Sequence, residues 1–242
     1  MKRRAILFYN DDGELKTKKD IDDMVSFLVS PTGGCWDDGR EIMCRKNVKK
    51  SELMSVVEKT RKECIDYLFL YFSGHGGFAR TSFIELNPDG ERVSTNFLLN
   101  LADRQLSILD CCRSMVDVEK RAFAMDSIYE AIGANICREA IRDAFDRRVM
   151  AAYPQSMTLY ACHVGEYAYD YGAGGVYTQN LLATTESFPD GFLLASTAHM
   201  EAYDMTVRET QNERRVQHPD FAMAKLPSRF QLPFAINPSQ TV

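Results

Sequence analysis

Residues 66–72 form a nearly unbroken run of apolar and aromatic side chains, Asp-Tyr-Leu-Phe-Leu-Tyr-Phe. The run is short and rich in aromatic residues, and polar residues do not alternate along it, so it predicts a strand that is covered on both faces. Such strands occur mainly in parallel sheets whose two faces are both covered by helices. This segment therefore predicts an α/β fold.

The rest of the chain alternates short apolar runs with amphipathic stretches, which is typical of strand–helix–strand units. The expected helices are 20–28, 50–64, 116–152 (at least in part) and 177–184. The expected strands are 5–9, 41–44, 66–72, 105–109 and 157–161, with a small hairpin of 83–86 and 92–94 and an edge strand over 230–236. We expect one domain over residues 1–242, with a mostly parallel central sheet of about six strands flanked by helices on both faces.

Composition narrows the class of protein. The 242 residues carry a net charge of −5, which argues against nucleic acid or an anionic membrane as a partner. Seven cysteines without regular spacing do not predict a disulfide framework. The apolar start ends at Asn10, too early for a signal segment, and no apolar run reaches membrane-spanning length. We expect a cytoplasmic protein.

Two of the predicted strands end in reactive side chains. His75 follows the 66–72 strand within Ser-Gly-His-Gly-Gly, and Cys111 and Cys112 follow the 105–109 strand. The interval of 112 − 75 = 37 residues is long enough for one crossover connection with a small hairpin inside it. Because functional groups gather at the carboxyl ends of parallel strands, we expect these residues to be neighbours.

A thiol beside an imidazole is a workable nucleophile and acid–base pair. The imidazolium favours the thiolate and later protonates the leaving amine. Backbone N–H groups near Gly76, together with that of Cys112, could stabilise an oxyanion. Taken singly, a cysteine after a buried strand is usually a core residue and a histidine between glycines usually marks a turn. Their occurrence together after two strong strands favours the catalytic interpretation.

Other interpretations of the same residues are weaker. The glycine segment lacks the lysine and the spacing of a phosphate-binding loop. The histidines and cysteines show no paired zinc-ligand spacing, so no metal site is predicted.

The segments Tyr-Phe-Ser-Gly-His-Gly (71–76) and Leu-Asp-Cys-Cys-Arg-Ser (109–114) together resemble the caspase-like cysteine peptidases, closest to metacaspases and their bacterial relatives. The resemblance extends to Gly-Gly-Val-Tyr-Thr (174–178) and Gln-His-Pro (217–219). It implies Cys112 as nucleophile, His75 as its partner and the N–H groups of Gly76 and Cys112 as oxyanion donors. It implies no third member of a triad, and Cys111 is expected to be packed.

The resemblance also places Asp110, and with a one-residue uncertainty in alignment Asp20, in the pocket for the residue before the cleaved bond. Two carboxylates there would select arginine or lysine by charge-assisted hydrogen bonds. For Asp20, an acid facing the dipole of its own helix is an equal alternative. Cys162 and His163 end the 157–161 strand and are expected to rim this pocket, with His163 a weaker rival of His75.

The chain departs from metacaspases after the nucleophile, where Arg113 replaces the usual histidine. Asp89, Asp117 and Glu119 are too scattered to predict a calcium site. No cofactor is therefore expected, and calcium activation is left open. The basic stretch within 116–152 lies where relatives are cut during activation, but a solvated helix face is the preferred interpretation.

The sequence thus predicts a cysteine endopeptidase that cleaves protein substrates after arginine or lysine and that could process itself. The alternative is a non-catalytic caspase-like interaction or scaffold module, and a nucleotide-binding domain is a weaker third reading. A regulatory protein partner and a role in bacterial stress or antiviral defence are implied by resemblance alone.

Overall fold

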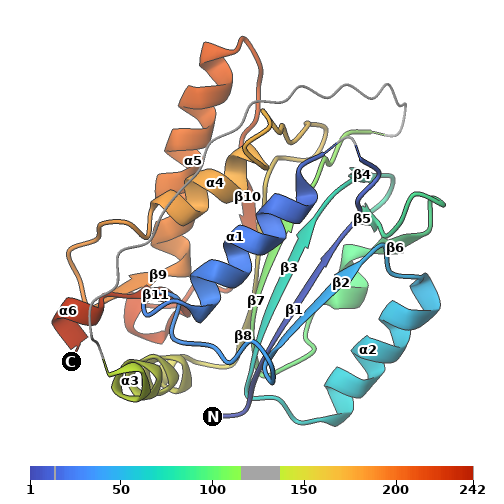
Figure 1. Cartoon of the computed structure of the whole chain (residues 1–242). Coiled ribbons are helices and arrows are strands. Elements are labelled where there is room, and N and C mark those ends of the chain that lie inside the picture. Colours follow the sequence, from blue (N-terminus) through green and yellow to red (C-terminus); the bar gives the residue numbers. More distant parts are fainter. Residues whose placement is uncertain (14, 116–136, 242) are drawn as a thin grey trace.

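The computed structural model describes residues 1–13, 15–115 and 137–241. A six-stranded sheet in the order β10-β8-β7-β3-β1-β2 forms its centre (Figure 1). Its strands are β1 (Arg3–Tyr9), β2 (Ile42–Lys46), β3 (Tyr67–Ser73), β7 (Arg104–Asp110), β8 (Gln155–Tyr160) and β10 (Asp220–Ala222). All neighbours pair in parallel except β10, which runs antiparallel to β8 at the edge. The predicted mostly parallel sheet is confirmed.

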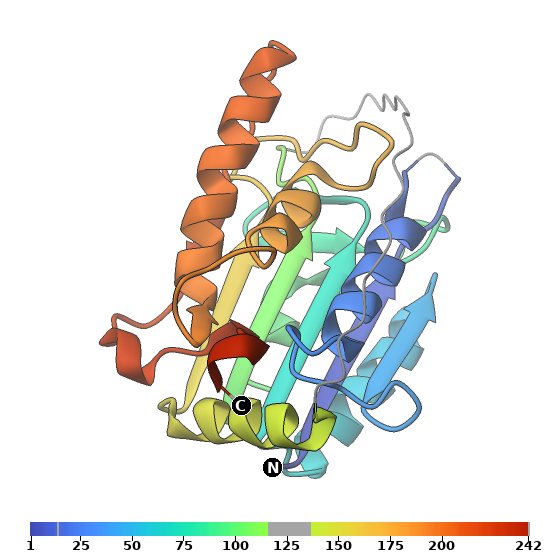
Figure 2. The same cartoon turned by 60° about the vertical axis from the view of Figure 1, so that its left-hand side comes forward.

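Helices cover both faces of this sheet, as the apolar run of β3 predicts. One face carries α1 (Thr17–Val29), α3 (Arg138–Ala151), α4 (Val176–Ala183) and α5 (Ala195–Asn212), and the other carries α2 (Lys50–Lys62) (Figures 1 and 2). Side chains of β3 alternate between two buried clusters. Tyr67, Phe69 and Tyr71 pack under the four helices, whereas Leu68, Leu70 and Phe72 pack under α2.

A small three-stranded antiparallel sheet is inserted between β3 and β7. It consists of β4 (Gly76–Phe78), β5 (Ser82–Glu85) and β6 (Arg92–Ser94), followed by the 3₁₀ helix η1 (Thr95–Leu98). The predicted hairpin is confirmed, and β4 is an additional strand that begins directly after His75. Ile84 and Val93 bury the insert against the α2 side of the core.

The carboxyl-terminal part differs from expectation. Residues 230–236 do not form an edge strand of the main sheet. Instead β11 (Pro233–Ile236), which follows the 3₁₀ helix η2 (Ser228–Phe230), pairs with β9 (Phe192–Leu194) in a separate two-stranded sheet. Phe234 packs 4.8 Å from the Phe27 ring, so this segment joins the core beneath α1.

Helix α5 was not anticipated, because its buried face is made of alanines and threonines, which give a weak apolar pattern. The short α6 (Pro238–Thr241) ends the described chain. Of the helical stretch predicted over 116–152, α3 is confirmed, and residues 116–136 lie outside the described residues.

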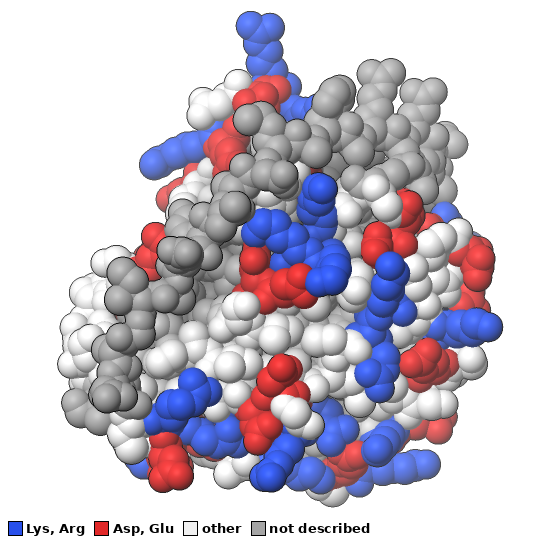
Figure 3. All heavy atoms as spheres, viewed as in Figure 1, with Lys and Arg blue, Asp and Glu red and all other residues white. Residues whose placement is uncertain are grey.

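Basic and acidic side chains are interspersed on the face shown in Figure 3. In the described ranges, no helix is long and apolar enough to cross a membrane.

Candidate active site

The register of β3 and β7 gives His75 and Cys112 equivalent positions just beyond two adjacent strands. Ser73 pairs with Asp110, an offset of 110 − 73 = 37 residues, and this offset holds along all seven paired positions. His75 and Cys112 have the same offset, 112 − 75 = 37, two residues beyond the ends of the strands. Both segments therefore leave the sheet side by side.

The two segments stay together beyond the sheet. Phe78 forms a parallel bridge with Met115, again at an offset of 115 − 78 = 37, and the Phe78 N–H donates to the Ser114 carbonyl at 3.0 Å. A Cβ atom at Gly76 would lie 2.8 Å from the Cys112 carbonyl oxygen, so only glycine fits this approach. The predicted neighbourhood of the histidine and cysteine segments is thus present on both sides of the pair.

The His75 ring has an acidic partner that the sequence did not predict. Its Nε2 lies 2.6 Å from Oδ2 of Asp12, which belongs to the loop between β1 and α1. Asp12 reads as part of an ordinary Asn-Asp-Asp-Gly turn, and its sequence position gives no signal of this contact. An ionised carboxylate can only accept, so Nε2 is the donor in this contact.

The Cys112 thiol is in a protonated resting arrangement. Its Sγ donates to the Ala168 carbonyl oxygen at 3.6 Å. Burial raises the pKa of this thiol to about 11, more than the Ala168 contact lowers it. The neighbouring Cys111 is buried, and burial raises the pKa of its thiol well above its usual range, as expected for a packed residue. The Cys112 thiol would have to leave the Ala168 carbonyl before it could act as a nucleophile.

Asp20 and Asp110 are both buried and meet at the beginning of α4. The Asp110 carboxylate accepts from the Thr178 backbone N–H at 3.1 Å and from the Thr178 hydroxyl at 2.6 Å. Asp20 accepts from the Gly175 N–H at 2.9 Å and from the Ser73 hydroxyl at 2.7 Å. Asp20 therefore does not serve the amino end of its own helix but binds the loop before α4.

Burial raises the pKa of both carboxyl groups. For Asp110 it rises to about 6, and for Asp20 burial and then the charge of Asp110 raise it well above its usual range. Two buried acids that resist ionisation in the absence of a counter-ion are suited to receive a cation.

The Cys162 side chain is completely buried, contrary to the expectation that it rims the pocket. Its single S–H lies within hydrogen-bonding distance of the carbonyl oxygens of Cys111 and Glu166. Cys162 therefore connects the segment of Cys111 and Cys112 to the loop that contains Glu166. His163 is half exposed and lies near Asp220, with its Nε2 3.9 Å from Oδ1. Cys162 therefore exposes no surface to a substrate in this conformation, whereas His163 does.

Arg113, the departure from the metacaspase pattern, is buried and fully engaged. It binds Asp220 at 2.8 Å and the Cys162 carbonyl at 3.1 Å, and its guanidinium lies 4.0 Å above the Tyr160 ring. Arg113 therefore fastens the segment after Cys112 to β8 and β10.

The proposed calcium ligands gain no support. Asp89 is exposed on the loop between β5 and β6, and Asp117 and Glu119 lie outside the described residues. Within the part of the chain that the structure describes, the three-residue group with converging ligand atoms is His163, Glu166 and His218, and Asp89 is not in it.

The caspase domain model matches residues 2–231, nearly the whole chain. This chain belongs to the caspase domain family. Membership indicates a cysteine peptidase, and the described α/β fold agrees with it.

Two solved structures show the same fold. Caspase-1 from Spodoptera frugiperda is 13% identical, with a TM-score of 0.56 over 91% of this chain and 86% of that one. A protein from Geobacter sulfurreducens is 16% identical, with a TM-score of 0.61 over 98% of this chain and 99% of that one. No curated protein matches the chain.

Proposed function

We propose that this caspase-family chain is a cysteine endopeptidase with His75 and Cys112 as its catalytic pair. The observation that carries this proposal is the constant offset of 37 residues between the two segments, on both sides of the pair. A thiol and an imidazole carried by segments that leave adjacent strand ends side by side are the parts that amide hydrolysis needs.

The reaction begins when Cys112 leaves the Ala168 carbonyl and its proton passes to His75. The thiolate attacks the carbonyl carbon of the substrate, and the N–H groups of Gly76 and Cys112 stabilise the oxyanion. The imidazolium returns the proton to the departing amine as the C–N bond breaks. Water then attacks the thioester with His75 as base, which releases the acid and restores the thiol.

Asp110 and Asp20 supply the preference for arginine or lysine before the cleaved bond. Both carboxylates are buried next to the nucleophile segment, and each is fixed by N–H or hydroxyl donors at the beginning of α4. An arginine guanidinium can bind carboxylates with paired hydrogen bonds and offset their mutual repulsion. Aspartate in this pocket would instead add a third negative charge.

The experiment compares fluorogenic peptides ending in Arg, Lys, Asp and Leu, with and without calcium. Cys112→Ala should abolish turnover, and the matched variant Cys111→Ala should retain it, because Cys111 is packed. No turnover of any peptide by the unmodified protein contradicts the peptidase proposal. Turnover only after Asp or Leu contradicts the pocket assignment and leaves the His75–Cys112 mechanism standing.

A non-catalytic interaction module is the second candidate, favoured by the bond of the Cys112 thiol to Ala168 and its raised pKa. A peptidyl-arginine chloromethyl ketone separates the two candidates. Alkylation at Cys112, located by peptide mass spectrometry, supports the peptidase. The same mass map of incubated protein, compared with Cys112→Ala, tests self-cleavage in the basic stretch 116–152.

A further inference from the structure

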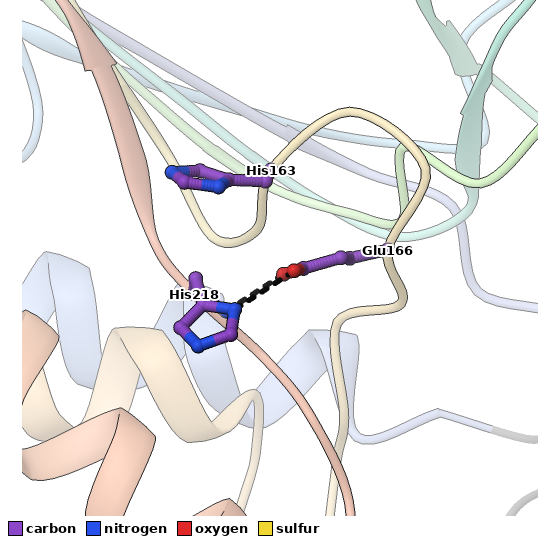
Figure 4. A group of neighbouring side chains, drawn as sticks. All are labelled: His163, Glu166 and His218. Carbon is purple, nitrogen blue, oxygen red and sulfur yellow. Dashed lines mark hydrogen bonds and ion pairs between the residues drawn. The ribbon is translucent and has the colours of Figure 1, made fainter.

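Three side chains outside the catalytic pair converge beside the cysteine segment. His163, Glu166 and His218 each bring a ligand atom within 4.8 Å of the other two (Figure 4). The first two lie on the loop after β8, and the third precedes β10. No part of the proposed peptidase reaction uses them.

A tight turn sets the first two side chains. The Glu166 N–H donates to the His163 carbonyl at 3.1 Å, and Gly165 adopts a φ of 93° inside the turn. A residue with a side chain rarely adopts that backbone conformation, so glycine stabilises this turn. The first and fourth residues of the turn are thereby held as neighbours.

Buried hydrogen bonds fix the third side chain. Gln217, the residue before His218, is fully buried, donates to the Ala161 carbonyl and accepts from the Tyr169 N–H, both at 3.0 Å. The His218 N–H itself donates to Glu166 Oε2 at 2.8 Å. The His218 backbone is therefore anchored to the loop that carries Glu166.

We propose that His163, Glu166 and His218 form a binding site for a divalent zinc-class cation. Two imidazoles and one carboxylate are a ligand set that zinc takes with a fourth position left to water. Ligand atoms around tetrahedral zinc are roughly 3.3 Å apart, given bonds of about 2.0–2.1 Å. The ligand atoms, which lie within 4.8 Å of one another, would have to approach further, and all three side chains are at least one-fifth exposed to solvent and so free to rotate.

The surrounding charge favours a cation. Glu166 is a ligand carboxylate, and Asp220 lies 3.9 Å from the His163 ring while its other oxygen binds Arg113. His218 Nδ1 lies 2.8 Å from Glu166 Oε1, so the His218 ring and the Glu166 carboxylate already face each other. If the cluster were only an ion pair between Glu166 and His218, the convergence of the His163 side chain on the same place would have no role.

The test uses full-length protein carrying Cys112→Ala, so that neither the proposed nucleophile nor self-cleavage contributes. Titration calorimetry with zinc chloride should show one equivalent bound. Cobalt(II) in its place should give visible d–d absorption without a sulfur-to-cobalt charge-transfer band. That band would mark binding at the free cysteines instead.

His163→Ala and His218→Ala should each weaken zinc binding by more than about a hundredfold, because losing a direct ligand costs more than the tenfold to hundredfold lost with a hydrogen-bond partner of a ligand. Glu166→Gln keeps an acceptor for the His218 N–H and should weaken binding without disturbing the fold, as circular dichroism can check. The control replaces the three exposed cysteines, Cys44, Cys64 and Cys137, by serine and should bind zinc unchanged. The proposal is wrong if the protein does not bind one equivalent of zinc. It is also wrong if binding is lost in the cysteine control and kept in His218→Ala. Because Cys112 is absent, neither result depends on peptidase activity.

Discussion

The His75 imidazole and the Asp12 carboxylate lie 2.6 Å apart, although 63 residues separate them in the chain. They meet because β1 and β3 are parallel neighbours, with Tyr9 paired to Ser73, so the segments that follow both strands emerge together. The contact fixes the ring orientation and the proton on Nε2. Asp12 is thus a positioning residue for the proposed base.

Replacing Asp12 by Asn removes the charge that holds the Nε2 proton, while an oxygen acceptor of similar size stays in place. We expect kcat for an arginyl peptide to fall roughly a hundredfold, the scale at which acid–base catalysis contributes, with KM little changed. The acidic limb of the pH–rate profile should also move, which a merely structural change would not produce.

Asp11→Asn is the matched control, because Asp11 binds Lys46 at 2.7 Å rather than His75. Its kcat should stay within about twofold of the unmodified protein, as expected for an exposed ion pair. Equal losses in the two variants would show that the loop, and not the Asp12 carboxylate, is what matters.

The preference for arginine should weaken in acid. The pKa of Asp110 is raised to about 6 by burial, so this carboxyl is ionised above pH 6 and takes up a proton as the pH falls through 6. A protonated acid cannot pair with a guanidinium. The ratio of kcat/KM for an arginyl peptide to that for its uncharged citrulline analogue should therefore drop about tenfold between pH 7.5 and pH 5.

Ionisation of His75 and Cys112 changes kcat/KM for both peptides by the same factor, so it does not affect the ratio. In Asp110→Asn the ratio should be low and should lose most of this pH dependence. A ratio that stays constant with pH in the unmodified protein would contradict the pocket role of Asp110.

Gly175→Ala should damage the specificity pocket directly. A Cβ atom at Gly175 would lie 2.4 Å from Asp110 Oδ2 and would displace this buried carboxylate. We expect a loss of about 1–3 kcal/mol in the free energy of unfolding, as for other overpacked positions, measured by urea denaturation. Gly39→Ala is an exposed control, since the nearest atom to its Cβ position, Asp37 Oδ1, lies 3.6 Å away and its φ is not positive. Its free energy of unfolding should change by less than about 0.5 kcal/mol.

Zinc should slow alkylation of Cys112 if the proposed metal site exists. The Glu166 carbonyl accepts from the Arg113 N–H at 3.0 Å, and the Ala168 carbonyl holds the Cys112 thiol. Fixing Glu166 to His218 through a metal therefore stabilises the loop that must open before Cys112 reacts. At pH 8 we expect saturating zinc to lower the iodoacetamide rate at Cys112 at least fivefold, read by peptide mass spectrometry.

His163→Ala should make that rate insensitive to zinc while leaving the zinc-free rate nearly unchanged, because the His163 ring is half exposed and its nearest ionic group, on Asp220, lies 3.9 Å away. The same slowing in both proteins would mean that zinc acts at Cys112 itself. Activity is not needed for this measurement, so the outcome is independent of whether peptides are cleaved.

The sequence by itself determined the parallel sheet, because the apolar runs of β1, β3 and β7 are local patterns that can be read without knowing their partners. The spacing of His75 and Cys112 can also be read from the sequence, and its length fits one crossover between adjacent parallel strands. The hairpin inserted after His75 is predictable too, because its turn residues are a local signal.

Only the tertiary structure decided which distant side chains meet. Asp12 contacts His75, Asp20 binds Gly175 rather than its own helix end, and His218 joins Glu166, each across 50 or more residues. Likewise β11 pairs with β9 and not with the main sheet. Such contacts depend on strand order and on the paths of the loops. Both are set by the free energy of the whole chain, and so they leave no periodic signal in any local segment.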